Sequence, residues 1–304
     1  MIESKRKEIV GGIMIVIKRD DEIVINNLED FSPKKIFECG QAFRYTVEED
    51  GSYTVVAFGK AINVSRRGDE VVLKGTNLLD YENIWKHYFD LDRDYEEIRA
   101  ELSKDEVLRP ALEYGKGIRI LNQDIFETTI TFIISANNQI PRIKKAVDII
   151  ARLYGEEFEG WDGKCYYSFP TAEVLKGVSP AELREKARVG FRDERIVRAS
   201  EMIYNKEVDI EAIKTMELSK MHEELMKLPG VGPKVADCIL LFSFGKSESF
   251  PVDVWIKRVV EELYIKEEIN KNKVADYGRK IFGDYAGFAQ QYLFYYGREN
   301  KLGK

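Results

Sequence analysis

The first quarter of the chain alternates apolar and polar residues with the period of two that is typical of β-strands. The apolar runs flank short charged turns at residues 19–21, 48–51 and 66–69, and two of these turns contain a glycine next to an aspartate. The pattern predicts strands at 15–18, 22–25, 43–47, 53–58, 61–65 and 71–74. We expect these strands to form an antiparallel meander.

From about Tyr81 the apolar residues take up helical spacing, and this pattern continues to the end of the chain. Helix-capping sequences stand at 124–127, 170–173 and 179–182, and Asp253 precedes a helical apolar stripe that begins at 254. The sequence therefore predicts an α+β fold. We expect a β-rich N-terminal domain at 1–115 and a helical domain at 116–304.

Composition narrows the class of protein. The chain has 304 residues, of which 44% are hydrophobic, and it has no apolar run near the roughly 20 residues that span a bilayer. Its three cysteines are far apart, which suits a reducing compartment and excludes both a disulfide framework and a Cys₄ iron–sulfur cluster. Two histidines stand in no zinc-binding spacing. The net charge of −6 disfavours nucleic acid as a partner. Whether the chain binds nucleic acid therefore depends on the local distribution of charge.

The segment Leu-Pro-Gly-Val-Gly at 228–232 lies between two helical patterns. Gly230 and Gly232 permit a tight turn with positive φ, and their bare backbone allows N–H groups to approach a phosphate. Taken alone, this hairpin fits a plain helix–helix turn as well as a DNA-binding one. Nearby cations favour DNA because they supply a local basic surface, namely Lys227, Lys234, Lys257, Arg258, Arg142, Lys144 and Lys145.

Lys234 occupies an unusual place for a lysine. Pro233 suits the first position of a helix, so Lys234 falls in the first turn, where the helix dipole opposes a cation. That placement would lower its pKa and favour the nucleophilic amine, whereas the alternative is an ordinary surface lysine. Cys238 lies one turn later on the same face, and its alternative is a small buried hydrophobe.

Three further positions carry candidate chemistry. Asp253 is suited to an N-cap, which would also fix its carboxylate beside a lysine for proton transfer or for stabilising a cation. Gln290 and Phe294 share a helix face and could hydrogen-bond and stack a flat base, although an aromatic core is the better interpretation for the tyrosines at 292, 295 and 296. Gly40 opens a strand and could allow close approach of a ligand, or could be an ordinary glycine.

These segments, in this order, resemble the 8-oxoguanine DNA glycosylase/AP-lyase family of the helix-hairpin-helix glycosylase superfamily, over about residues 25–300. Residues 228–238 match the family's hairpin, with Lys234 at the position of its catalytic lysine, and 251–253 match the segment that carries its aspartate, here Asp253. Residues 40–44 match the loop whose glycine carbonyl reads the oxidised base. Residues 287–290 and Phe294 match the helix that binds and stacks that base.

Two more segments resemble the family's DNA contacts. In the segment 137–142, Asn137 would fill the gap left by the extruded base and Arg142 would read the orphaned cytosine. In the segment 190–192, Phe191 would wedge the base stack and Arg192 would touch the same cytosine. Phe191 replaces a tyrosine, which implies looser opposite-base discrimination, and Trp255 stands where eukaryotic members carry a phosphate-contacting histidine. Positions 139 and 141 also depart from the family pattern.

The resemblance implies a TATA-box-binding-protein-like sheet packed on the helical domain, and a bifunctional glycosylase. Lys234 would attack C1′ and form a Schiff base, with Asp253 supporting the developing positive charge. Gly40 would read N7–H, Gln290 the Watson–Crick edge, and Phe294 and Cys238 would sandwich the ring. The amides of the hairpin would grip a phosphate, and the backbone of Gly230 and Gly232 could also hold a cation.

The implied partner is double-stranded DNA containing 8-oxoguanine, bound by a monomer with no membrane contact, no cofactor and no essential metal. The lack of a basic tail or targeting segment favours a prokaryotic protein of the cytoplasm and nucleoid. Two alternatives stay open. A monofunctional alkylbase or adenine glycosylase is disfavoured by Lys234 and by the dispersed cysteines. In a non-catalytic DNA-binding hairpin protein, Lys234 and Asp253 would be incidental.

Overall fold

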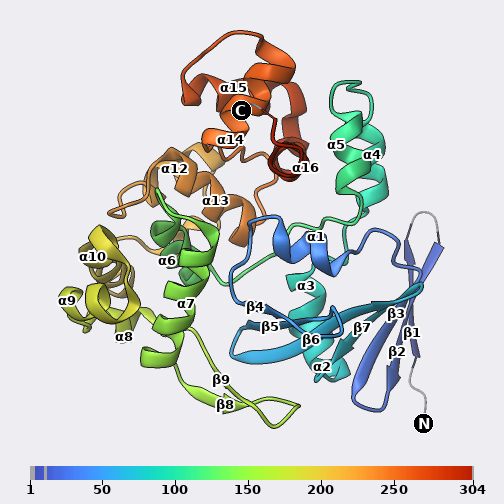
Figure 1. Cartoon of the computed structure of the whole chain (residues 1–304), viewed down its shortest axis with the longest axis horizontal. Coiled ribbons are helices and arrows are strands. Elements are labelled where there is room, and N and C mark those ends of the chain that lie inside the picture. The colour runs from blue at the N-terminus through green and yellow to red at the C-terminus, as the bar shows by residue number, and fades with distance from the viewer. Residues whose placement is uncertain (1–3, 10–11, 303–304) are drawn as a thin grey trace.

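A seven-stranded antiparallel sheet lies at one end of a larger helical body in the computed structural model, which describes residues 4–9 and 12–302 (Figure 1). The predicted α+β fold is confirmed. In spatial order the strands are β1 (Ser4–Ile9), β2 (Gly12–Arg19), β3 (Glu22–Asn26), β7 (Glu70–Lys74), β6 (Lys60–Arg67), β5 (Tyr53–Ala57) and β4 (Tyr45–Val47).

The predicted hairpins are confirmed, but a simple meander is wrong. Strand β3 pairs with β7, with Ile23 opposite Leu73, and β4 lies at the far edge of the sheet. The reason is that the chain leaves the sheet after β3, forms helix α1 (Pro33–Glu38) and returns at the other side. This excursion carries the Gly40 turn away from the sheet and towards the helical body (Figure 1).

Aromatic side chains attach α1 and the following helices to the sheet. The ring of Phe37 stacks on that of Tyr53 from β5, with centroids 5.5 Å apart, and it meets the ring of Phe89 edge-on. Trp85 is fully buried in the same cluster. Burying such large rings is strongly favourable, so α1 is held in place on the sheet.

Helices build nearly all of the remaining chain. Their bounds are α2 (Leu78–Asp80), α3 (Lys86–Tyr88), α4 (Tyr95–Leu102), α5 (Arg109–Gly115), α6 (Ile125–Ser135), α7 (Ile140–Tyr154), α8 (Ala172–Lys176), α9 (Pro180–Glu182), α10 (Asp193–Tyr204), α11 (Ile210–Ile213), α12 (Leu218–Leu225), α13 (Pro233–Ser243), α14 (Val254–Val260), α15 (Lys271–Phe282) and α16 (Ala286–Glu299). Three predicted starts are confirmed by side-chain caps, from Asp124 at α6, Thr171 at α8 and Asp253 at α14.

The prediction of helix to the end of the chain is wrong at one place. Strands β8 (Glu157–Glu159) and β9 (Cys165–Tyr167) form a hairpin, in which Gly163 takes φ +74°. The ring of Trp161 at its tip lies against Gly75, where a Cβ atom would come within 2.5 Å of it. The hairpin therefore packs on the end of β7, and only a glycine leaves room for that contact.

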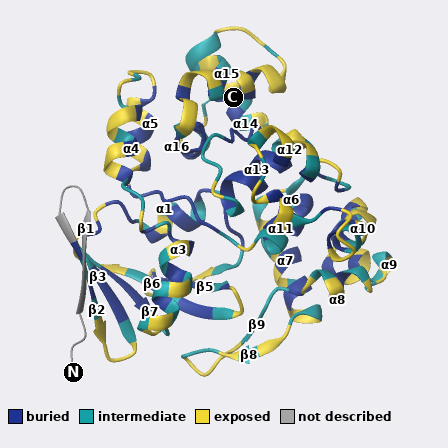
Figure 2. Ribbon diagram, turned by 180° about the vertical axis from the view of Figure 1, so that it is seen from behind, coloured by how far each residue is buried: buried dark blue, intermediate teal, exposed yellow. Residues whose placement is uncertain are grey.

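The helical core centres on α6 and α13, which are almost wholly buried (Figure 2). Phe132 of α6 and Phe242 of α13 stack with centroids 5.6 Å apart. Helix α4 packs on α16 through Tyr95 and Phe288, so segments from both ends of the chain share this core. A domain boundary at residue 115 stays a prediction. Within the part of the chain that the structure describes, no helix has the length and apolarity to cross a bilayer.

Candidate active site

A pocket of about 350 Å³, open solvent at its mouth included, lies among the turn after α1, helix α13 and helix α16. All the residues predicted to be catalytic or base-binding line it, namely Gly40, Lys234, Cys238, Asp253, Gln290 and Phe294. Sequence reasoning missed the other lining residues, which are Cys39, Phe132, Phe242, Pro251 and Gln291. The pocket thus draws on segments up to about 250 residues apart.

The glycine hairpin joins α12 to α13 and is closed by the Val231 N–H, which donates to the Leu228 carbonyl at 3.0 Å. Gly230 uses the positive φ that a glycine permits, at +92°, whereas Gly232 is extended at φ −102°. Gly232 instead serves as the N-cap of α13, a position that calls for extended backbone.

Lys234 is the second residue of α13, in the first turn as predicted. Its side chain is half-buried, and its Nζ lies 5.1 Å from the centre of the Phe132 ring at the pocket wall. The amine therefore lies beside an aromatic ring at the place where the pocket meets the wider opening. A molecule bound in the pocket would therefore meet the amine directly, as a nucleophile requires.

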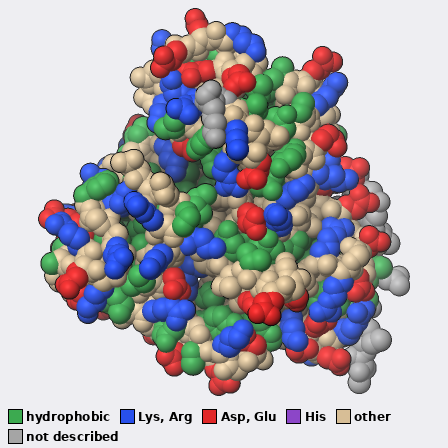
Figure 3. Space-filling view, viewed as in Figure 1, with side chains coloured by type: hydrophobic (Ala, Val, Ile, Leu, Met, Phe, Trp, Pro, Cys, Tyr) green, Lys and Arg blue, Asp and Glu red, His purple; other side chains and the backbone are tan. Residues whose placement is uncertain are grey.

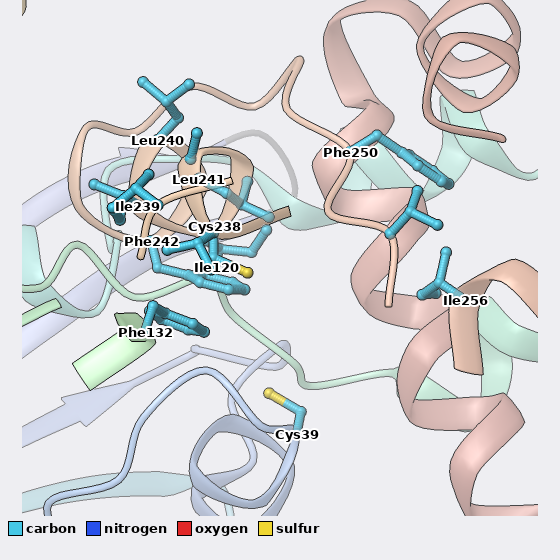
Figure 4. Close-up of a cluster of buried hydrophobic side chains, with 14 of the residues drawn as sticks. Cys39, Ile120, Phe132, Cys238, Ile239, Leu240, Leu241, Phe242, Phe250 and Ile256 are labelled. Atoms are coloured by element: carbon cyan, nitrogen blue, oxygen red, sulfur yellow. The ribbon is translucent and has the colours of Figure 1, made fainter. Parts of the chain in front are cut away.

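The side chains of Cys39 and Cys238 line the pocket as uncharged thiols. Burial raises the pKa of Cys238 to about 11, although the neighbouring Lys234 side chain acts in the opposite direction. Burial likewise raises the pKa of Cys39 to about 11. Figure 4 shows Cys39 on the N-terminal segment with its sulfur pointing towards the side where Cys238 and Phe132 lie. At neutral pH both groups are thiols, which suits packing against a flat apolar surface.

Asp253 both caps a helix and lines the pocket. Its Oδ1 accepts the Ile256 N–H at 2.8 Å at the start of α14, which fixes the orientation of the carboxyl group. Because the same side chain shares the pocket with Lys234, a negative charge is available where a cation would develop on a bound sugar.

Gln290 is the most informative residue of the pocket. It is only 5% exposed, and its Oε1 finds no hydrogen-bond partner among the described residues. A buried carbonyl oxygen left without a donor costs about 1–3 kcal/mol. Such a cost is expected where a ligand supplies the missing donor.

Gly40 and Phe294 shape the other side of the pocket. Gly40 has φ +84°, and a Cβ atom there would lie 3.0 Å from Cε1 of the Phe294 ring. A side chain at position 40 would therefore strain the backbone and press on the ring. With an aromatic ring, a thiol and an unpaired acceptor, the pocket suits a flat heterocycle that carries N–H donors.

A wider groove opens from this pocket. It is lined by Gly40, Lys234 and Phe294 together with four residues predicted to contact DNA, namely Asn137, Arg142, Gly230 and Gly232. Phe191 and Arg192 do not line it. Phe191 is 54% exposed on the short turn before α10, with the guanidinium of Arg195 5.1 Å from its ring centre.

Arg192 is placed differently from an open base-reading residue. It is 6% exposed, and its guanidinium donates to the carbonyls of Ala136 at 2.9 Å, Asn137 at 2.9 Å and Val189 at 3.0 Å. It therefore holds the turn after α6, in which Asn137 has φ +52°. Sequence reasoning did not anticipate this contact because the two segments are over 50 residues apart.

Two of the seven predicted basic residues are engaged in ion pairs. Lys227 pairs with Glu224, Lys257 pairs with Glu261, and Lys144 lies over the ring of Tyr45. Arg142 and Lys234 do line the groove, and Lys271 joins them. Figure 3 shows Lys and Arg side chains interspersed with apolar ones on this face. In the described ranges 4–9 and 12–302, no group of acidic, His or Cys side chains could hold a metal ion.

Comparison with known proteins shows what this arrangement is similar to. Residues 23–129 match the family model described as 8-oxoguanine DNA glycosylase, N-terminal domain, and residues 130–283 match that of the HhH-GPD superfamily base excision DNA repair protein. A probable N-glycosylase/DNA lyase of Methanothermobacter thermautotrophicus is 34% identical over 235 residues, covering 71% of this chain and 75% of the relative. The N-glycosylase/DNA lyase of Saccharomyces cerevisiae is 31% identical, covering 84% and 75%.

Solved structures agree with the family models. The Clostridium acetobutylicum 8-oxoguanine glycosylase/lyase, in complex with double-stranded DNA containing cytosine opposite to 8-oxoG, has a TM-score of 0.91 and 44% identity to this chain. The match covers 99% of each chain. A 3-methyladenine DNA-glycosylase from Archaeoglobus fulgidus shares the fold with a TM-score of 0.73 at 24% identity.

Proposed function

This chain belongs to the 8-oxoguanine DNA glycosylase family, and from that membership we propose that it excises 8-oxoguanine from duplex DNA and then cleaves the strand as an AP lyase. The observation that carries the proposal is the buried, unpaired Oε1 of Gln290. The N1–H and N2–H groups of an 8-oxoguanine base are donors of the kind that this oxygen lacks.

Discrimination from guanine is assigned to Gly40. 8-Oxoguanine carries a proton on N7, where guanine has a lone pair, and the Gly40 carbonyl would accept that N7–H. With guanine, two acceptors would face each other and the carbonyl would lose its partner. One such buried hydrogen bond is worth about 1–3 kcal/mol, which is roughly 5- to 150-fold in rate.

Lys234 and Asp253 perform the chemistry. The Nζ lone pair of Lys234 forms a bond to C1′ while the bond from C1′ to the base breaks and its electron pair leaves with the base, which is protonated. Loss of a proton from Nζ and opening of the sugar ring give a Schiff base. That iminium acidifies the C2′ proton, and its removal expels the 3′ phosphate. The Asp253 carboxylate stabilises the positive charge on the sugar.

DNA binding uses the groove and the residues beside it. The N–H groups of the Gly230–Gly232 hairpin would bind a backbone phosphate, and Phe191 would insert into the base stack while Asn137 fills the vacated space. Residues 228–232 offer a cation no acidic side chain, but the Leu228 carbonyl keeps a free lone pair after accepting the Val231 N–H. Backbone oxygens could therefore hold a cation there.

We assign Arg142, exposed at the start of α7, to the cytosine left opposite the extruded base. Arg192 would reach the same cytosine only if it gave up part of its bonding to the turn after α6. The enzyme would act as a monomer on chromosomal DNA in the cytoplasm of a prokaryote.

The decisive experiment traps the Schiff base. The protein is incubated with a duplex containing 8-oxoguanine opposite cytosine in the presence of borohydride, which reduces the imine to a stable amine. We expect a covalent protein–DNA adduct that is lost in Lys234→Gln. Lys227→Gln is the matched control, since this lysine lies immediately before the same hairpin but pairs with Glu224. An adduct that survives Lys234→Gln, or the absence of any adduct, would contradict the assignment.

A further inference from the structure

Two side chains of helix α16 hydrogen-bond to the backbone immediately before Gly40. Gln291 is 2% exposed, and its Nε2 donates to the Cys39 carbonyl at 2.8 Å. Two turns later, Nη2 of Arg298 donates to the Glu38 carbonyl at 2.7 Å. Because positions 291, 294 and 298 share one helix face, the two donors lie on either side of Phe294 along the helix.

The backbone after Gly40 is held just as firmly. The fully buried Gln41 side chain donates to the carbonyls of Ile36 and Arg119 at 2.9 and 2.8 Å and accepts the Leu121 N–H at 2.9 Å. The Gln41 carbonyl in turn accepts from Nε2 of Gln123 at 2.9 Å. Gly40 therefore lies between two residues, Cys39 and Gln41, whose carbonyl groups are both held by hydrogen bonds.

Glycine by itself does not fix the direction of its carbonyl group, because its backbone rotates with little steric cost. A hydrogen bond weakens steeply with misalignment, so a carbonyl group that recognises one N–H group must be held in a fixed orientation. We propose that Gln291, assisted by Arg298, is a positioning residue that fixes the Cys39–Gly40 peptide so that the Gly40 carbonyl meets the N7–H of the oxidised base. This inference rests on the proposed function, and it assigns damage selectivity to a residue of α16 that acts through the backbone beside Gly40.

The alternative is that Gln291 only satisfies a buried carbonyl and supports the fold. A coupling experiment separates the two roles. Gln291→Met keeps the length of the side chain and removes the donor. Single-turnover excision is measured with 8-oxoguanine and with its 7-deaza analogue, in which carbon replaces N7 and the N–H donor is lost, each opposite cytosine. If Gln291 acts through the Gly40 carbonyl, the analogue is insensitive to its loss.

We expect Gln291→Met to slow excision of 8-oxoguanine about tenfold, as for one impaired buried hydrogen bond, and excision of the analogue less than about twofold. Cleavage of a preformed abasic site should be unchanged, since that step needs no base in the pocket. Equal losses on both bases, or no loss on either, would overturn the positioning role. If the wild-type protein excises no 8-oxoguanine at all, the proposed function fails instead.

Two further sets of variants keep the test decisive. Asn122→Leu removes a part-buried bond of similar length, from Nδ2 to the His87 carbonyl at 2.9 Å, outside the pocket lining, and should leave the ratio of the two rates unchanged. Should Gln291→Met fail to fold, Arg298→Met provides the same comparison, and Arg298→Lys, which retains a donor, should recover part of the selectivity. An unchanged ratio in Arg298→Met would then refute the proposal.

Discussion

The pair of neighbouring glutamines on α16 allows a sharp test of the pocket. Gln290 and Gln291 are both nearly buried, but Gln290 has an unpaired Oε1 whereas Gln291 donates to the Cys39 carbonyl. Replacing a buried, unsatisfied amide by an apolar side chain of similar size removes a desolvation cost, while removing a satisfied donor leaves its acceptor unpaired. The two substitutions should therefore change stability in opposite directions.

The unpaired oxygen sets the magnitude. Relief of an unsatisfied buried carbonyl predicts that Gln290→Leu raises the free energy of unfolding of the DNA-free protein by about 1–2 kcal/mol, which corresponds to a few degrees in Tm. The same substitution should lower kcat/KM for excision of 8-oxoguanine by roughly 5- to 150-fold, because the base loses one acceptor. Gln291→Met should instead lower the free energy of unfolding by about 1–3 kcal/mol.

Urea unfolding without DNA measures the first effect, and single-turnover excision measures the second. Cleavage of a preformed abasic site serves as the internal control and should stay within about twofold of the wild-type rate, since Lys234 is untouched. If Gln290→Leu destabilises the protein as much as Gln291→Met does, the oxygen of Gln290 is satisfied in solution. The inference of a missing ligand donor would then be wrong.

Three other predictions test separate parts of the molecule. Phe294→Ala should slow excision about tenfold or more while leaving binding to an abasic-site analogue nearly intact, and equal loss of both, measured by gel shift and kinetics, would contradict stacking. Burial raises the pKa of Glu127 to about 7 from an ordinary 4.5, although Arg44 lies 3.5 Å away, so the stability it contributes is full below about pH 4.5 and is lost as the pH rises through 7. The free energy of unfolding of Glu127→Gln, measured by urea titration, should therefore rise relative to that of the wild type by up to about 3 kcal/mol from pH 5 to pH 8. A difference that does not change with pH would contradict the predicted pH dependence. Arg279→Met should cost about 3 kcal/mol at pH 7, because it removes the guanidinium 2.8 Å from the buried Asp237 carboxylate and leaves it only His222 at 3.6 Å, and the loss should shrink as the pH falls; unfolding at pH 5 and 7 checks this.

Local patterns predicted much of the fold because they report local forces. The alternation of residues before 75 and the caps at Asp124, Thr171 and Asp253 are decided within a few residues, and the structure agrees with them. The pairing of β3 with β7 joins segments over 40 residues apart. The alternation of residues along a strand does not indicate which distant strand it pairs with. The β8–β9 hairpin did carry a signal in its Asp162–Gly163 turn, but its strands have only three residues each.

The site shows the same limit. Resemblance placed Lys234, Asp253, Gln290 and Phe294, and the structure brings them into one pocket, although their roles stay predictions. Phe132 could not be distinguished by sequence from any other apolar residue of a buried helix. Contacts between distant segments, such as that of Arg192 with the turn after α6, depend on the packing of helices and leave no mark on local periodicity.

The origin of the Gly40 turn has a consequence for how such enzymes can change. The turn belongs to the part of the chain matched by the N-terminal family model, whereas Lys234 belongs to the part matched by the HhH-GPD model. In the proposed mechanism, the carbonyl that reads N7–H and the amine that attacks C1′ thus lie on different stretches of the gene, and the base-binding residues of α16 lie beyond both matches. Exchange of the N-terminal stretch in the laboratory would therefore change the turn that reads N7–H, while the reacting amine, its helix and the base-binding face of α16 stay unaltered.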